Sequence, residues 1–294
     1  MEKLHIKDIE FNDLYSIDEE YMKTMAPIYG VIFLFKYGNI DNQFALSNKP
    51  MFGEYNQNYQ QDNIIFAKQT IHNACATIAV LNILLNVENI DLGPEISQFK
   101  SFISGFDSET IGDTISNSDL IRLVHNSFSS PSMIIDEDKL TNNQNFDNSE
   151  LYHFIAYLPI NGQLYELDGL KQYPITHGPC SNHQFLQKLP AVLNQRISKY
   201  GEELRFSCLA ITNNKLVEAQ NAHDEVEIQH QLQKRNNWAR ENELRKHQFN
   251  GLIFELLKNI SRKCDDKQWN ELLNDARKKS QSSLLQMLSK QKKM

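Results

Sequence analysis

The chain has 294 residues, 40% of them hydrophobic, which is enough for one large domain or for one domain with an appendage. Its four cysteines form no CxxC pair and no cluster at metal-ligand spacing, so we expect no disulfide framework, no zinc site and no cofactor. No apolar run approaches the roughly 20 residues that span a bilayer, and no signal-peptide pattern opens the chain. These features favour a globular protein of the cytoplasm or nucleus that does not bind a membrane.

The net charge of −7 is unevenly distributed along the chain. Residues 1–212 carry −12, whereas residues 213–294 carry +5, so the two parts are expected to face different partners. An acidic body argues against nucleic acid as a substrate and favours a basic protein or peptide, because opposite charges are steered together. A surface that is acidic only for solubility remains an equal alternative.

A buried strand and a buried helix are the first strong patterns. Residues 30–36 form an apolar run between Pro27 and Gly38, which predicts a central strand. Residues 39–63 are rich in Asn, Gln, Gly and Tyr without periodicity, which predicts a surface loop. Residues 73–85 are apolar nearly all round, which is typical of a helix buried within the fold.

Two more helices precede a long polar segment. Residues 94–105 have Pro near the start and Gly at the end, and residues 118–127 have a plausible N-cap at Ser118 or Asn117; both stretches predict helices. Residues 128–150 are polar and long for a connection within a compact domain. Loops of that length usually cover an active site or lack structure.

A hairpin signal follows at Asn161-Gly162, with the apolar strands 152–160 and 163–167 on either side. A helix over 182–200 and a strand over 204–212 are predicted after it.

The predicted fold class is therefore α+β, a central, mostly antiparallel sheet flanked by helices. The body covers residues 1–212. Residues 213–294, rich in charged and amide helix formers and amphipathic around 249–257, predict a helical C-terminal domain with a basic tail.

Four residues can form a catalytic arrangement. Cys75 lies in the first turn of the buried helix, where the helix dipole and free backbone N–H groups favour a thiolate. In the hairpin register Ile155 faces Asp168, which places His153 diagonal to Asp168 on the same face. Gln69 precedes Cys75 by six positions, and its amide could donate to an oxyanion.

Each of these residues also has a structural interpretation. Cys75 could be core packing, His153 a hydrogen-bonded strand residue, Asp168 a turn acceptor and Gln69 a surface amide. A nucleophilic thiol needs a base, and that base needs an orienting acceptor, so the interest lies in the set of residues rather than in any single one.

The motifs around these residues strongly resemble the ubiquitin C-terminal hydrolases, cysteine peptidases with a papain-superfamily-like fold. The resemblance rests on residues 66–77, 116–122, 125–128, His153 and 165–170. It implies a deubiquitinase that cleaves after the C-terminal Gly of ubiquitin and binds ubiquitin conjugates. It also implies that residues 128–150 form a loop crossing over the site.

The same resemblance assigns the four roles. It makes Cys75 the nucleophile, His153 the general base and acid, Asp168 the residue that orients His153, and Gln69 the oxyanion donor.

Farther along, Arg245–His247 and Leu252–Lys258 look like the C-terminal domain of the long, proteasome-associated member of that family. This implies a proteasomal ubiquitin-receptor subunit as partner and, in some lineages, a chromatin-remodelling complex. The basic residues Arg277–Lys279 and Lys290–Lys293 correspond to the tail that makes the receptor contact.

One departure from the family pattern stands at the N-terminus. Family members usually begin with a segment that bears a Trp and a Glu-Ser-Asp-Pro-like turn and supplies an early strand. Because this chain opens with Met1-Glu-Lys-Leu, we expect it to enter the fold late. Two alternatives therefore remain: a catalytically silent ubiquitin-binding scaffold, and a papain-like peptidase or acyltransferase of other specificity.

Overall fold

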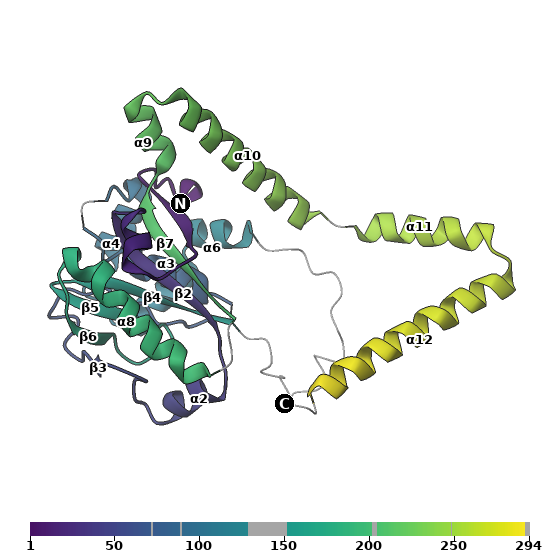
Figure 1. Cartoon of the computed structure of the whole chain (residues 1–294), viewed down its shortest axis with the longest axis horizontal. Helices are drawn as coiled ribbons and strands as arrows, with labels where there is room; N and C mark the ends of the chain where they lie inside the picture. Colours follow the sequence, from purple (N-terminus) through teal and green to yellow (C-terminus); the bar gives the residue numbers. More distant parts are fainter. Residues whose placement is uncertain (72, 89, 129–151, 202–204, 248, 292–294) are drawn as a thin grey trace. The chain divides into compact units, whose positions relative to one another are not determined.

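The computed structural model describes residues 1–71, 73–88, 90–128, 152–201, 205–247 and 249–291. These residues fall into two compact units, one reaching to Asn242 and the other running from Glu243 onward. Figure 1 labels the helices and strands along the chain.

The first unit is built on a seven-stranded sheet with the order β1-β7-β2-β4-β5-β6-β3, in which every pairing is antiparallel. The strands are β1 (Ile9–Leu14), β2 (Ile28–Lys36), β3 (Glu54–Tyr55), β4 (Tyr152–Ile160), β5 (Gln163–Leu167), β6 (Ile175–Pro179) and β7 (Phe206–Asn213). The α+β class with an antiparallel sheet is confirmed.

Helices surround this sheet and also make up the end of the chain. Those of the first unit are α1 (Glu19–Lys23), α2 (Asn39–Leu46), α3 (Cys75–Leu84), α4 (Gly93–Phe102), α5 (Ser108–Asn117), α6 (Asp119–Asn126), α8 (Phe185–Ile197) and α9 (Lys215–Ala222). Helix α10 (Glu225–Lys246) begins in the first unit, and α11 (Asn250–Lys263) and α12 (Asp266–Gln291) belong to the second. Short 3-10 turns lie at Glu2–Leu4, Asn182–Gln184 and Ser198–Tyr200.

The apolar run of β2 is the centre of the sheet, between β7 and β4 (Figure 1). Alternate residues point to opposite faces, so Ile32 joins a hydrophobic cluster with α3 while Val31 and Phe33 join a second cluster with α8. The two clusters sandwich the sheet. Gly30 is required in this strand, because a Cβ there would lie 2.8 Å from the side chain of Ile83.

The hairpin is also as predicted. Asn161 and Gly162 both have positive φ, 50° and 76°, as the two-residue turn of type I′ requires. The register pairs Tyr157 with Glu166 and Ile160 with Gln163.

Two expectations for the N-terminal half are wrong. The chain does not enter the fold late, because β1 forms from residues 9–14 and pairs with β7 at the sheet edge. The predicted loop over 39–63 contains α2, whose start is capped by Asp41 accepting the N–H of Gly38 at 3.0 Å, and the two-residue strand β3.

Helix α5 was not among the helices predicted from the sequence. Asp107 caps it by accepting the N–H groups of Glu109 and Thr110, each at 3.0 Å. This short helix lies next to the segment that carries Gln69, so its absence from the prediction bears on the site.

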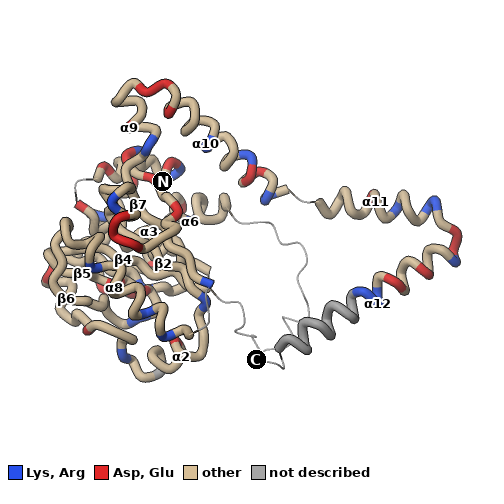
Figure 2. Tube along the Cα trace, in the orientation of Figure 1, with Lys and Arg blue, Asp and Glu red and all other residues tan. Residues whose placement is uncertain are grey.

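The C-terminal extension is helical, as predicted, and α9 together with most of α10 belongs to the first unit. Arg235 of α10 contacts the carboxylate of Glu10 at 3.0 Å and the side chain of Asn214 at 2.7 Å. Charged residues of both signs occur along α12 (Figure 2). Within the described ranges, none of the helices combines the length and hydropathy needed to cross a membrane.

Candidate active site

Cys75 is the first residue of α3 and is partly exposed. The residue two positions before it, Asn73, has a φ of 66°, a left-handed conformation that Asn tolerates better than most residues. This turn leads the chain into the helix, so that the thiol lies at its N-terminal end.

His153 and Asp168 form a buried pair. His153 lies near the start of β4 and Asp168 directly follows β5, and the two residues are 4% and 2% exposed. The Nε2 atom of His153 lies 2.6 Å from Oδ1 of Asp168. The same carboxylate oxygen accepts the N–H of Leu170 at 3.0 Å, which fixes its orientation.

The pKa values of this pair are strongly shifted. Burial lowers the pKa of His153, but the charge and hydrogen bond of Asp168, together with the side chain of Cys75, outweigh it and raise the pKa from 6.5 to about 9. Burial raises the pKa of Asp168, but the charge and hydrogen bond of His153 and the amide of Leu170 lower it from 3.8 to about 2. The two groups therefore form an ion pair at neutral pH, and Cys75 lies close enough to the histidine to contribute to its raised pKa.

Two aromatic rings hold the imidazole. Phe35, which pairs with His153 in the register of β2 and β4, and Tyr37 both meet the ring edge-on, each with centroids 5.8 Å away. The sequence analysis missed these contacts. They could have been inferred only from the pairing of β2 with β4, which links segments more than 100 residues apart.

Two hydrogen bonds hold Gln69, one from its backbone and one from its side chain. Its backbone N–H donates to the carbonyl of Gly169 at 2.9 Å, and its side-chain Nε2 donates to the carbonyl of Ile71 at 3.1 Å. A Cβ at position 169 would lie 3.2 Å from the Gln69 nitrogen, so the close approach favours glycine there. The amide nitrogen carries two protons, which leaves one for an oxyanion.

A buried charged cluster lies behind the histidine. Arg196 of α8 contacts Glu166 of β5 at 2.8 Å and lies over the ring of Phe35, 4.8 Å from its centroid. His177 of β6 contacts the other oxygen of Glu166 at 3.0 Å. The ring of Phe35, which packs against His153, is thus in contact with a guanidinium that is held in place by an ion pair with Glu166.

The other thiols of the first unit, Cys180 and Cys208, are buried, whereas Cys75 is partly exposed. Burial raises the pKa of Cys208 to about 12, and burial likewise raises the pKa of Cys180, so both thiols stay protonated in the core. Among the described residues, no group of three or more His, Cys, Asp or Glu side chains could hold a metal ion.

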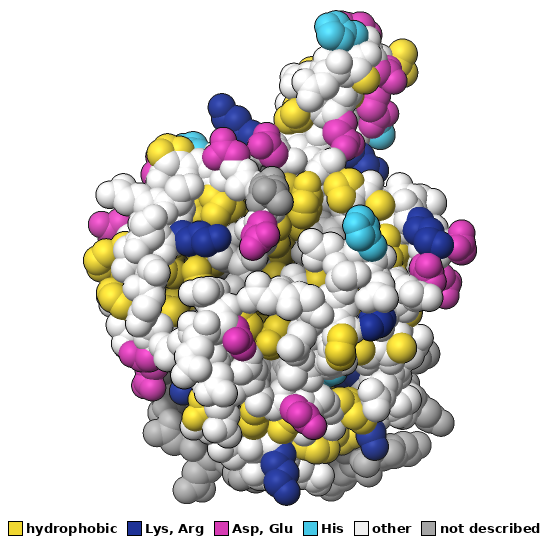
Figure 3. Space-filling model, turned by 90° about the vertical axis from the view of Figure 1, so that its left-hand side faces the viewer, with side chains coloured by type: hydrophobic (Ala, Val, Ile, Leu, Met, Phe, Trp, Pro, Cys, Tyr) yellow, Lys and Arg dark blue, Asp and Glu magenta, His cyan; other side chains and the backbone are white. Residues whose placement is uncertain are grey.

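The site does not coincide with either of two large cavities among the described residues of the first unit. These have volumes of about 870 and 640 Å³, and neither is lined by Cys75, His153, Asp168 or Gln69. On the face shown in Figure 3, apolar side chains form small groups separated by polar and charged ones. The segment 128–150, expected to cross over the site, lies outside the described residues except for its first residue.

The structure thus brings His153 and Asp168 together, places Cys75 where it contributes to the raised pKa of His153, and anchors the segment of Gln69 against the loop after Asp168. A histidine that stays charged at neutral pH beside a thiol supports nucleophilic attack by sulfur. That chemistry defines a cysteine hydrolase.

Comparisons with known proteins identify the family. The sequence model for ubiquitin carboxyl-terminal hydrolase, family 1, matches residues 1–198, and a further model for ubiquitin carboxyl-terminal hydrolases matches residues 222–264. The chain belongs to this family of cysteine-type deubiquitinating enzymes.

Relatives agree with this assignment. Ubiquitin carboxyl-terminal hydrolase 2 of Schizosaccharomyces pombe is 40% identical, with 95% of this chain and 92% of that protein covered. Isozyme L5 of Dictyostelium discoideum is 37% identical over 72% of this chain and 58% of its own length. The UCH37 catalytic domain of Trichinella spiralis, solved bound to ubiquitin vinyl methyl ester, matches with a TM-score of 0.59 and 31% identity over 72% of this chain and 90% of that one.

Proposed function

We propose that this chain cleaves the peptide or isopeptide bond after the C-terminal Gly of ubiquitin, through an acyl-enzyme on Cys75. The observation that carries the proposal is the buried His153–Asp168 pair, 2.6 Å apart, whose histidine interacts with the thiol at the start of α3. Membership of the family, and a relative solved with a ubiquitin probe, support ubiquitin as the substrate.

Each of the four residues has one task in this reaction. The Cys75 sulfur attacks the carbonyl carbon of the last Gly, and an S–C bond forms as the charge moves to the carbonyl oxygen. The N–H of Cys75 and the free proton of Gln69 Nε2 stabilise that oxyanion. The imidazolium of His153 then gives its proton to the leaving amine as the C–N bond breaks.

The second half of the reaction regenerates the thiolate. Neutral His153 takes a proton from water, the resulting hydroxide attacks the thioester carbon, and the C–S bond breaks to release the ubiquitin carboxylate. The second proton of the water leaves the new carboxylic acid for solvent or for the freed amine. His153 is left protonated and the sulfur is left as thiolate, so atoms and charges balance over the cycle. Asp168 keeps the imidazole oriented and stabilises its charged form in both halves.

The decisive experiment incubates the purified chain with ubiquitin that carries a C-terminal electrophile and measures the intact mass. We expect one adduct on the wild type and none on Cys75→Ala. The variant should also lose hydrolysis while binding ubiquitin near the wild-type level, because catalysis and surface recognition are separable. A folded wild-type chain that forms no adduct would instead favour the silent ubiquitin-binding scaffold.

We also propose that the C-terminal helices bind a proteasomal ubiquitin-receptor subunit, which would place the enzyme at the proteasome. In α11 a series of large apolar side chains is 43–66% exposed, namely Leu252, Ile253, Phe254, Leu256, Leu257 and Ile260. Such a group on a helix is typical of a surface that docks against a partner.

The basic residues Arg277–Lys279 lie in α12 and remain candidates for the same contact, whereas the side chains of Lys290–Lys293 lie outside the described part. A chromatin-remodelling complex as second partner, and residence in both cytoplasm and nucleus, are proposals of the same kind.

The substitution Phe254→Glu tests this surface. It should leave hydrolysis of a ubiquitin C-terminal amide unchanged and weaken binding to the purified receptor at least tenfold, because it places a charge in an apolar contact. Lys258→Glu, which also adds a carboxylate to α11, is the matched control and should weaken binding less. Equal binding by wild type and Phe254→Glu in a calorimetric titration would contradict the proposal.

A further inference from the structure

The segment that carries Gln69 belongs to no strand, yet its backbone is hydrogen-bonded at every second residue. Residues 64–69 have no assigned secondary structure and lie between the turn before them and the start of α3. The N–H groups of Ile65, Ala67 and Gln69 are all bonded to partners outside the segment. A period of two is that of one edge of a strand, so something substitutes for the missing neighbour strand.

The substitute is a pair of asparagines, Asn82 within the nucleophile's own helix α3 and Asn86 in the turn just after its end. Asn82, fully buried in α3, accepts the N–H of Ala67 at 2.8 Å and donates to the carbonyl of Ala67 at 3.3 Å. Asn86, four residues on, does the same for Ile65, at 2.8 and 2.6 Å. Each side-chain amide thus makes the two bonds that a neighbouring strand residue would make.

The four-residue spacing of the two asparagines matches the two-residue spacing of the backbone groups that they bind. Residues four apart lie on the same face of a helix, about 6 Å apart along its axis, and two residues of extended chain span about the same distance. Asn86 also donates to the backbone carbonyl of Asn82 at 2.7 Å, which fixes one amide against the other. The two amides are therefore held in register with the segment.

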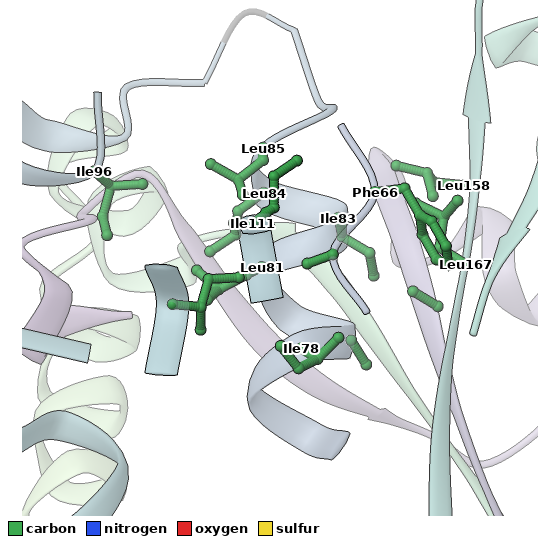
Figure 4. Close-up of a cluster of buried hydrophobic side chains, with 14 of the residues drawn as sticks. Phe66, Ile78, Leu81, Ile83, Leu84, Leu85, Ile96, Ile111, Leu158 and Leu167 are labelled. Atoms are coloured by element: carbon green, nitrogen blue, oxygen red, sulfur yellow. The ribbon is translucent and has the colours of Figure 1, made fainter. Parts of the chain in front are cut away.

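Packing and one further hydrogen bond hold the remaining sides of the segment. The side chain of Phe66 lies in the hydrophobic cluster with Leu158 and Leu167 (Figure 4). On the opposite edge, the N–H of Lys68 donates to the carbonyl of Ser108 at 2.9 Å. Gly112 allows α5 to come this close, because a Cβ there would lie 2.1 Å from the Lys68 carbonyl oxygen.

We propose that Asn82 is a positioning residue for the oxyanion site, with Asn86 in the same role one step farther from it. Helix α3 carries Cys75 at its start and Asn82 seven residues later, so one rigid element sets the place of both the nucleophile and the oxyanion donor. Asn82 holds Ala67, and Ala67 fixes where Gln69 emerges two residues on. The inference rests on the proposed role of Gln69 as donor.

The test is the kinetics of Asn82→Leu, which keeps the side-chain size and removes both hydrogen bonds. We expect kcat for a ubiquitin C-terminal amide to fall on the order of 10- to 100-fold, because a displacement of about 1 Å at a catalytic group has effects of that size. KM should stay within about twofold, since Asn82 is fully buried and cannot contact a bound substrate. Leu84→Ala, which disturbs the same helix without removing a hydrogen bond, is the matched control and should keep kcat within about twofold.

A double variant separates positioning from general loss of structure. If Asn82 acts through Gln69, adding Asn82→Leu to Gln69→Ala lowers kcat no further than Gln69→Ala alone. Two losses that multiply would show that Asn82 serves the fold and would overturn the inference. So would a normal kcat in Asn82→Leu when Gln69→Ala is impaired, and this result would leave the proposed function intact.

Asn86→Leu keeps the inference testable if Asn82→Leu does not fold. Asn86 is less buried and one step farther from Gln69, so we expect a fall in kcat of a few-fold that also disappears in the Gln69→Ala background. An Asn86→Leu chain with wild-type kcat would overturn the inference. If Gln69→Ala itself keeps wild-type kcat, the donor role assigned under the proposed function fails, and the positioning role fails with it.

Discussion

Helices α3 and α11 have similar apolar residues and opposite surroundings. In α3, Ile78, Leu81 and Leu84 are at most 2% exposed and pack into the cluster beneath the sheet. In α11, Leu252 and Phe254 are more than half exposed. The apolar side chains of α3 are buried within the fold of the first unit. Those of α11 are left exposed by the second unit.

This difference separates two functions. The proposed chemistry needs only groups of the first unit, because the base, its orienting carboxylate, the thiol and the amide donor all lie between residues 69 and 168. The second unit contributes apolar surface and charge rather than a catalytic group. We therefore expect changes in the first unit to alter rate and stability, and changes in α11 to alter partner binding alone.

The largest effect is expected from Asp168→Asn. The substitution removes the charge that raises the pKa of His153 to about 9, so the histidine loses its proton at a lower pH. We expect kcat to fall by about 10² to 10⁴, the range for losing oriented general acid–base catalysis.

The pH dependence of kcat/KM should show in which direction the pKa of His153 moves in Asp168→Asn. Activity needs a charged histidine beside a thiolate, so in the wild type the alkaline limb of kcat/KM should lie near pH 9. In Asp168→Asn it should move toward the ordinary histidine value of 6.5. Asp113→Asn, at an exposed position of α5, should leave the profile in place. An unchanged alkaline limb in Asp168→Asn would mean that another group sets it.

Sequence periodicity was sufficient for the elements with strong local signals. The apolar run of β2, the Asn161-Gly162 turn and the buried helix that begins at Cys75 each have a pattern that only one structure satisfies. The hairpin register alone placed His153 near Asp168. His153 lies in β4, and Asp168 directly follows the neighbouring strand β5.

What the sequence could not show depends on distant pairing. Phe35 reaches His153 only because β2 pairs with β4, and no local pattern reveals that pairing. The buried Asn82 of α3 and the partly buried Asn86 just after its end looked like minor interruptions of an apolar segment, although their four-residue spacing was a visible signal. Strand β1 was missed because a six-residue edge strand has little periodicity to detect.

The smallest changes test the comparison of the two helices directly, with the same substitution on each. Leu81→Ala in α3 should lower the free energy of unfolding of the first unit by about 2–5 kcal/mol, because it opens a cavity at a site only 1% exposed. Leu256→Ala in α11, at a site 52% exposed, should change it by no more than about 0.5 kcal/mol.

The two tryptophans allow each unit to be followed separately, since Trp238 lies in the first unit and Trp269 in the second. Urea unfolding of chains that retain only one tryptophan would show which unit each substitution affects, without assuming a single transition for both. Leu81→Ala should shift only the Trp238 transition. If Leu256→Ala shifts it as much, α11 is part of the structural core of the first unit, and its apolar residues are not reserved for a partner.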